Sequence, residues 1–119
     1  RQSLEMRKRI HGEDSDHPNI AVVLNRLGNN YSDMEEYSKA EEYYRLSLDM
    51  YKRIHGEDSD HPDIADELRG LGKTYGEMRD HEKAKIHLEL ALNMYTRLYG
   101  NDNQHPDIQN VKKYMSKYK

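Results

Sequence analysis

Residues 53–62 read Arg-Ile-His-Gly-Glu-Asp-Ser-Asp-His-Pro, and the same ten residues occupy positions 9–18 in the same order. A looser copy at 97–106 keeps the closing His-Pro pair, so the three copies lie 44 residues apart and hold all three prolines of the chain. An internal period of about 20 to 50 residues is typical of solenoid proteins, whose units bury apolar faces only against neighbouring units. We therefore interpret the chain as a repeat array, a class of protein that presents long surfaces and seldom builds catalytic pockets.

The composition is polar for a folded protein, and the period explains why. Hydrophobic and charged residues each make up 34% of the chain, and the mean hydropathy is −1.20. In an aperiodic chain these values would suggest disorder, whereas here the regular pattern predicts a thin helical stack. A length of 119 residues holds about 2.7 periods, so we expect a piece of a longer array.

Several classes of function are disfavoured by the composition. The chain has no cysteine, so disulfides and thiolate zinc sites are excluded, and we expect a reducing, cytoplasmic location. The net charge of −3 argues against nucleic acid as a partner, because phosphate neutralisation needs a concentrated basic surface. We expect no membrane partner either, since the sequence contains no apolar run near the roughly 20 residues that span a bilayer.

Helical periodicity follows the first proline. Apolar residues recur at three- and four-residue spacing from Ile20 to Met34, as one face of an α-helix requires. After a break at 35–37, a second helical pattern runs from Ala40 to about His55, where a glycine follows as a stop signal. The next copy repeats both patterns.

We therefore expect an all-α array of about six antiparallel helices. Its predicted parts are a helix at about 1–11 with its loop to 17, full units at 18–61 and 62–105, and a last helix within 106–119. Proline is well placed in the first turn of each later helix, because its missing N–H would have no partner there.

The spacing of large and small residues resembles the tetratricopeptide repeat. Leu24-x2-Leu27-Gly28-x2-Tyr31 is followed by Ala40-x3-Tyr44, and the second copy is similar. The resemblance implies a right-handed superhelix of antiparallel helix pairs, A and B, in which the small residues let the helices of a pair approach closely. It implies no cofactor.

The long loop before each A helix resembles, more particularly, the kinesin light chain type of this repeat. It has the form Gly-x4-His-Pro and is two residues longer than in the usual 42-residue unit of that subfamily. Two departures concern turns: Lys52 and Thr96 stand near the place of the proline that usually ends helix B, and Glu35 and Arg79 stand at the A-to-B turn where glycine is common.

The resemblance also implies which positions face a ligand. In this family the A helices line a concave groove, and two columns of residues on them contact the bound peptide. The first column here reads Asn25, Arg69, Lys113, the second reads Asn29, Lys73, Lys117, and Arg26 and Lys112 lie beside them.

These columns form a ladder of amides and cations on an otherwise acidic chain. Amides can pair with a peptide backbone, while arginine and lysine attract carboxylates. We therefore predict a noncatalytic scaffold that binds an extended, acidic peptide through Asn25, Arg26, Asn29, Arg69, Lys73, Lys113 and Lys117. The alternative interpretation is an ordinary solvated helix face, and Asp33, Asp66 and Glu77 would weaken the positive field.

The repeated histidines and acids also allow a metal interpretation, which the sequence does not favour. His55, Asp58, Asp60 and His61 repeat an earlier set, but neither a His-Glu-x-x-His helix nor a calcium loop is present. We expect a structural role instead, in which the loop fixes the angle between units. No residue stands in a catalytic motif, so we expect no enzyme activity.

A second hypothesis concerns the two ends. A half unit at each end could stack head to tail between copies of the chain, and the protein would then be a self-assembling structural segment, a homo-oligomer.

Overall fold

The computed structural model describes residues 18–100 and 104–119, which contain five helices and no strand. The helices are α2 (Pro18–Asp33), α3 (Tyr37–His55), α4 (Pro62–Glu77), α5 (His81–Tyr99) and α6 (Pro106–Lys117). The predicted all-α repeat solenoid is thus confirmed. The helix predicted at about 1–11 lies outside the described residues.

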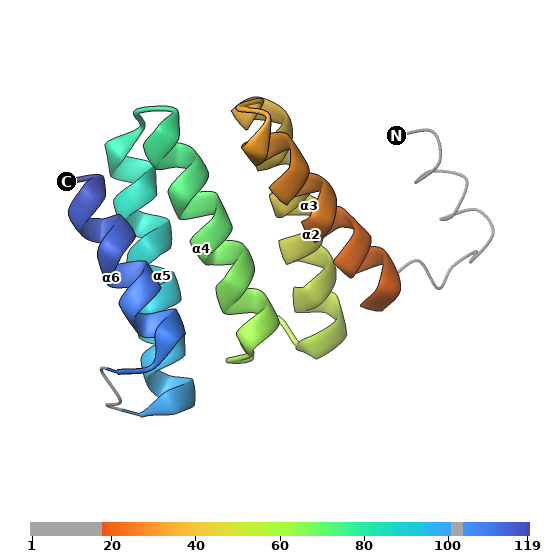
Figure 1. Cartoon of the computed structure of the whole chain (residues 1–119). Coiled ribbons are helices and arrows are strands. Elements are labelled where there is room, and N and C mark those ends of the chain that lie inside the picture. Colours follow the sequence, from red (N-terminus) through yellow and green to blue (C-terminus); the bar gives the residue numbers. More distant parts are fainter. Residues whose placement is uncertain (1–17, 101–103) are drawn as a thin grey trace.

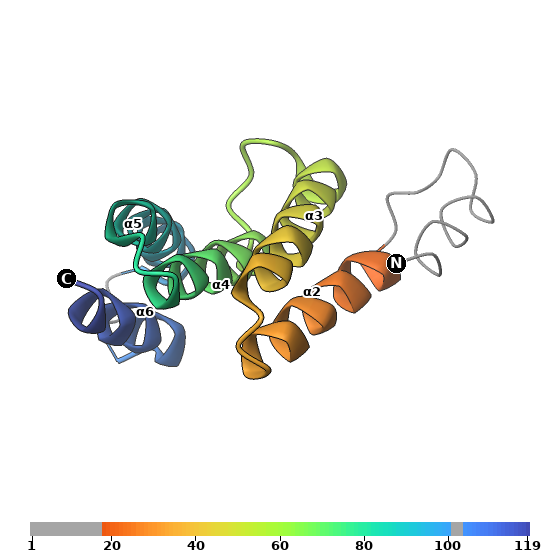
Figure 2. The same ribbon diagram turned by 90° about the horizontal axis from the view of Figure 1, so that it is seen from above.

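The helices alternate between two layers. The A helices α2, α4 and α6 form one row, and the B helices α3 and α5 lie on the other side of it (Figures 1 and 2). Each helix packs mainly on its neighbours in the chain, and α2 and α4 also touch directly. This arrangement leaves the row of A helices available as a surface.

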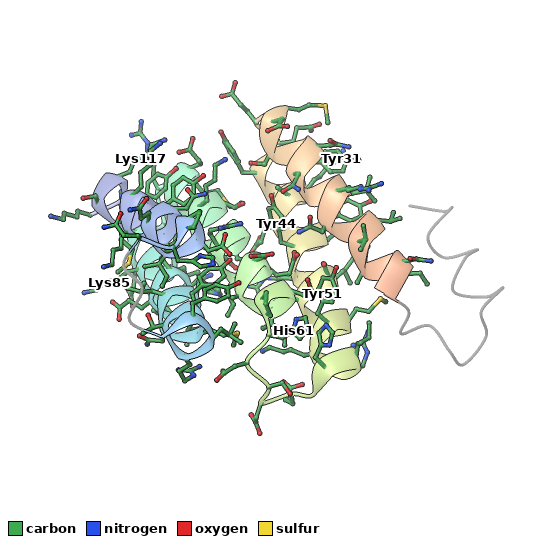
Figure 3. The ribbon with its side chains drawn as sticks, turned by 60° about the horizontal axis from the view of Figure 1, so that its bottom comes forward. Tyr31, Tyr44, Tyr51, His61, Lys85 and Lys117 are labelled. Atoms are coloured by element: carbon green, nitrogen blue, oxygen red, sulfur yellow. The ribbon has the colours of Figure 1, made fainter. Side chains whose placement is uncertain are left out.

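The core lies between the two layers and depends on small residues at the close crossings. Ala40 and Ala84 are fully buried, as the sequence pattern predicts. Tyr44 of α3 reaches between α2 and α4 (Figure 3), where a Cβ added to Gly28 or Gly70 would come within about 3 Å of its ring. The two glycines therefore make the notch through which Tyr44 reaches the A-helix face.

The His-Pro pairs start helices, as the sequence predicts. His61 and His105 are the N-cap residues of α4 and α6, and a proline follows each in the first turn. The Nδ1 atom of His61 accepts a hydrogen bond from the backbone N–H of Asp63 at 3.1 Å, and His105 does the same for Asp107 at 3.2 Å. The imidazole thus satisfies one of the backbone donors that a helix start leaves unpaired.

The A-to-B turns have a regular geometry although glycine is absent from them. Glu35 and Arg79 adopt φ values of 60° and 66°, in the left-handed region that costs a side chain energy. The N–H groups of Glu35 and Glu36 bond back to Ser32 and Tyr31, and the turn at Arg79 repeats this pair of bonds. These are Schellman motifs, so the turn is kept and a non-glycine residue occupies its strained position.

Candidate functional site

A groove of about 320 Å³ crosses the A-helix face. Its wall comes from α2, α4 and α6, and Tyr44 and Tyr51 of α3 close its floor. The wall contains side chains of both charges and several amides. We treat this groove as the candidate binding site, because it is the concave surface that the repeat architecture provides.

The groove contains four of the seven predicted site residues. Asn25 and Asn29 come from α2, and Arg69 and Lys73 from α4. The other three residues, Arg26, Lys113 and Lys117, do not line it, and all three are exposed.

On α6 the groove is lined by Asn110 and Tyr114. These positions lie one helical turn before the predicted Lys113 and Lys117, and the sequence prediction did not include them. Lys117 instead pairs with Glu77, its Nζ atom lying 3.4 Å from Oε2. The wall on α6 is thus neutral where the predicted ladder continues with lysines.

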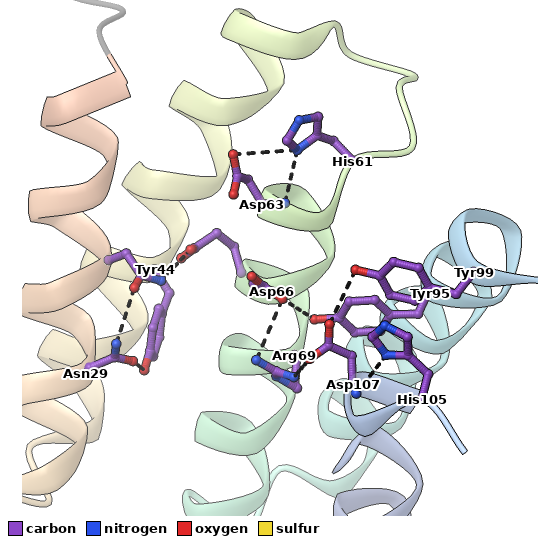
Figure 4. Close-up of polar contacts among 12 residues, drawn as sticks. Asn29, Tyr44, His61, Asp63, Asp66, Arg69, Tyr95, Tyr99, His105 and Asp107 are labelled. Carbon is purple, nitrogen blue, oxygen red and sulfur yellow. Dashed lines mark hydrogen bonds and ion pairs between the residues drawn. The ribbon is translucent and has the colours of Figure 1, made fainter. Parts of the chain in front are cut away.

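The two asparagines belong to a chain of hydrogen bonds. The hydroxyl of Tyr44 donates to Oδ1 of Asn29 at 2.5 Å, and Nδ2 of Asn29 donates to Oδ1 of Asn25 at 3.2 Å (Figure 4). Asn25 in turn donates to Oε2 of Glu67. The amides are therefore held in place, and each retains a second N–H that a ligand can use.

Glu67 is the groove residue that sequence reasoning missed. Its side chain is only 2% exposed, and Oε1 has no hydrogen-bond partner among the described residues. Burial raises the pKa of this carboxyl from its ordinary value of 4.5 to about 8, because the interior disfavours the charged form. The sequence did contain one sign of it: Glu67 is the only acid at its repeat position, because the residues 44 positions before and after it are Val23 and Val111.

Arg69 is in the groove wall, but its charge is already balanced. Its Nη1 atom donates to Oδ1 of Asp107 on α6 at 3.2 Å, and Nη2 lies 3.6 Å from Oδ1 of Asp66 (Figure 4). Its guanidinium carbon also lies 5.7 Å from the centre of the Tyr95 ring. Arg69 therefore ties α4 to α6, and a ligand carboxylate would have to compete with two internal ones.

Lys73 differs from Arg69 in its surroundings. Its Nζ atom lies over the ring of Tyr114, 5.7 Å from the centroid. No ion pair of Lys73 occurs within the ranges that the structure describes. The amine thus stands beside Asn110 and Tyr114 in the groove wall, in reach of a bound acidic group.

The histidine and acid cluster is built at the start of α4. The rings of His55 and His61 stack with centroids 3.5 Å apart, and Oδ2 of Asp63 lies 3.1 Å from Nε2 of His55. These three side chains could offer ligand atoms within 4.8 Å of one another. However, Nδ1 of His61 already accepts the N–H of Asp63, and lone pairs of stacked rings do not converge on one ion.

The next copy of this cluster supports a structural role. Tyr99 takes the place of His55 there, and its ring stacks on His105 with centroids 3.7 Å apart. The stack therefore forms without a second imidazole. This supports the prediction that the loop fixes the angle between units.

None of the helices within 18–100 and 104–119 has both the length and the apolar character that crossing a membrane requires.

Comparison with known proteins gives one clear match. The family model described as "Tetratricopeptide repeat" matches residues 20–63 and 68–107. A search of curated proteins found no match. The family match covers most of the chain and includes both helix pairs, together with the start of α6.

Proposed function

Because the chain belongs to the tetratricopeptide repeat family, we propose that it binds an extended acidic peptide in the groove formed by its A helices. Repeats of this family generally mediate protein–protein interaction and serve as noncatalytic scaffolds. The peptide would be a segment of a partner protein. It would lie across α2, α4 and α6 in the groove lined by Asn25, Asn29 and Lys73.

The observation that carries this proposal is the position of Lys73. It stands in the groove wall next to an aromatic ring, with the anchored amides of α2 across the groove. A carboxylate of the peptide would pair with its amine, and the remaining N–H groups of Asn25 and Asn29 would donate to peptide carbonyls.

The other predicted residues take lesser parts in this proposal. Arg69 would orient the wall through Asp66 and Asp107 and add positive potential to it. Arg26, Lys113 and Lys117 are exposed outside the groove, where they would attract an acidic peptide before it docks.

We also assign the array to the kinesin light chain type. The loop Gly-x4-His-Pro before each A helix supports this assignment, and so do the helix starts at Pro18, Pro62 and Pro106, which are 44 residues apart. Because this spacing exceeds the usual 42-residue unit, the array would be a variant of the type with a longer loop.

Peptide binding can be measured by fluorescence anisotropy. The probes are a labelled peptide of alternating glutamate and serine and its lysine–serine counterpart. We expect only the acidic peptide to bind, and Lys73→Glu to weaken its binding at least about tenfold, which corresponds to about 1.4 kcal/mol. Lys39→Glu is the matched control, because Lys39 is an exposed lysine of α3 outside the groove.

The same titration can contradict the proposal. Equal affinity for the two peptides would exclude recognition of acidic character. Unchanged affinity in Lys73→Glu would exclude the groove. Arg69→Glu is a poorer choice, because reversing that charge would also place three carboxylates together between α4 and α6.

A further inference from the structure

The groove floor contains a tyrosine hydroxyl that has no hydrogen-bond partner among the described residues. Tyr51 of α3 lines the groove and is only 7% exposed. Its ring stacks on His55, but its hydroxyl bonds to no residue within 18–100 or 104–119. Because a buried donor without an acceptor costs free energy, a ligand that supplies an acceptor here would gain affinity.

The next unit shows which partner this hydroxyl lacks. Tyr95 of α5 is the repeat counterpart of Tyr51, 44 positions later. Its hydroxyl donates to Oδ1 of Asp66 on α4 (Figure 4). The same oxygen lies 3.6 Å from Nη2 of Arg69. The second unit therefore contains a hydroxyl donor, a carboxylate acceptor and a cation that balances the carboxylate.

In the first unit the acceptor is missing. Val22 stands at the repeat position of Asp66, and Asn25 stands at that of Arg69. A valine side chain cannot accept a hydrogen bond. Val22, Asn25 and Tyr51 all line the groove, so the first unit presents a hydroxyl donor to the groove where the second unit bonds its own carboxylate.

The charges near Tyr51 determine which kind of acceptor fits. Burial raises the pKa of Tyr51 to about 12, and neighbouring acids, Asp63 and Asp66 among them, add to this rise. The hydroxyl thus keeps its proton and remains a donor. Asp63 and Asp66 also line the groove wall, where they would repel a ligand carboxylate. A peptide carbonyl has no net charge and avoids this repulsion.

The basic part of the groove lies further along α4. Lys73 follows Asp66 by about two helical turns, or ~10 Å along the axis, which is the length of about three residues of an extended peptide. An acidic group can therefore pair with Lys73 while another part of the same peptide lies at Tyr51.

We propose that Tyr51 is a specificity residue of the groove, whose hydroxyl donates to an uncharged main-chain carbonyl of the bound peptide beside Val22. This inference rests on the proposed function and adds an order to it. The acidic residues of the peptide pair with Lys73, and an uncharged segment of the peptide lies at Tyr51.

The test uses a labelled serine peptide that carries one pair of adjacent glutamates, which sets its register at Lys73. Binding to the whole chain is measured by fluorescence anisotropy. We expect Tyr51→Phe to weaken binding by about threefold to tenfold, the range of one hydrogen bond. Tyr43→Phe is the matched control, because Tyr43 is a buried tyrosine of α3 that does not line the groove, and it should leave the affinity unchanged.

A series of esters identifies the carbonyl. Each peptide bond of the probe is replaced in turn by an ester, whose carbonyl is a weaker acceptor. Because an ester also removes an N–H, each one is measured against both proteins as a double-mutant cycle. We expect one ester, about three residues from the glutamates, to be coupled to Tyr51→Phe by at least about threefold. A second glutamate pair at that position should weaken binding.

A further variant supplies the missing acceptor from the protein itself. Val22→Asn places a carbonyl oxygen at the position of Asp66 without adding charge, and Asn110 already holds this register in α6. We expect Val22→Asn to weaken probe binding as Tyr51→Phe does, and the two substitutions together to be no weaker than either alone. Val22→Ala, which supplies no acceptor, should bind the probe like the original protein.

Lys73→Glu separates this inference from the proposed function. If Lys73→Glu weakens binding but Tyr51→Phe does not, or if no ester is coupled to Tyr51, the role of Tyr51 is refuted and the groove proposal stands. Tighter binding of the probe with the second glutamate pair would also refute it, because the hydroxyl would then take a carboxylate. If Lys73→Glu has no effect, or no probe binds, the proposed function fails and this inference fails with it.

Discussion

Glu67 is the residue whose chemistry departs most from its repeat counterparts. Val23 and Val111 hold the same register, and a buried carboxyl with an unpaired oxygen costs free energy that a valine does not. In return, Glu67 accepts the amide of Asn25 and fixes the end of the hydrogen-bond chain along α2. The buried carboxyl of Glu67 thus lowers the stability of the fold and fixes the position of the Asn25 amide in the groove.

The substitution Glu67→Val tests whether the buried carboxyl lowers stability. The folded-state pKa of about 8 lies above the ordinary 4.5, so the folded protein holds the proton more tightly than the unfolded chain. The favourable contribution of protonated Glu67 to the free energy of unfolding is complete below pH 4.5. It is lost as pH rises through about 8, and the free energy of unfolding then changes by at most about 1.4 kcal/mol per pH unit. We expect Glu67→Val to be more stable than the original protein at pH 8 by about 1–3 kcal/mol.

The measurement is the difference between the two urea unfolding curves across pH. The two proteins must be compared at each pH because hydrogen bonds and cations lower the pKa of other carboxyls, such as Glu77 and Asp60. The stability that those carboxyls contribute increases with pH, in the opposite direction to that of Glu67. Glu67→Gln is the control, since it keeps the shape and removes the titration. A pH-independent difference for both variants would contradict the buried-acid explanation.

At the scale of the element, α4 combines a well-formed start with a strained end. Its start carries an imidazole cap and a proline, as does the start of α6, and it is followed by Arg79 in the left-handed region, as α2 is followed by Glu35. Both turns keep the two backbone bonds of the Schellman motif, so the strain is local and does not alter the packing of A on B.

Arg79→Gly should therefore stabilise the protein. Glycine removes the left-handed penalty of about 1–2 kcal/mol but adds backbone entropy to the unfolded chain, which leaves a gain of about 0.5–1 kcal/mol. We expect the thermal midpoint to rise by a few degrees. Met78→Gly is the matched control: its φ of −79° suits any residue, so glycine there should lower the midpoint. A lower midpoint in Arg79→Gly would show that its side chain makes a stabilising contact.

The elements were predictable from the sequence because local physics determines them. The positions of Pro62, Gly56 and Ala84 fix where helices begin, end and cross, and each prediction agrees with the structure. The sequence also predicted that Asn25 and Lys73 lie on the inner face of the A helices, and both line the groove. What could not be predicted was which side chains find partners across units: the pairing of Arg69 with Asp107 depends on the rotation of α6 against α4.

The same reason explains the residues that were missed. Periodicity places Glu67 on an inner face but does not show that Asn25 would meet its carboxyl. Similarly, the sequence makes Tyr44 a core residue, and only the glycine notch shows that its hydroxyl emerges beside Asn29. The geometry of this surface thus depends on contacts between residues 15 to 42 positions apart.

At the scale of the whole molecule, the array is a row in which each unit is held by its neighbours. α6 packs on α5 and is tied to α4 by the Arg69–Asp107 pair and by Tyr118, which lies against Gly76. In such a solenoid the loss of one interface should loosen the adjoining unit more than distant ones. The groove is lined in part by Asn110 and Tyr114 of α6, so this surface depends on the attachment of that helix.

Arg69→Met tests this coupling. It keeps much of the aliphatic volume but leaves Asp66 and Asp107 without their shared cation, at a cost of about 1–3 kcal/mol. We expect hydrogen exchange of α6 amides to accelerate most, while α2 and α3 stay protected. Arg45→Met is the control, because Arg45 bonds to Glu41 and Tyr75 and should loosen the contact of α3 with α4 instead. A uniform loss of protection in all helices would mean that the array unfolds as one cooperative unit, and that α6 cannot change its attachment alone.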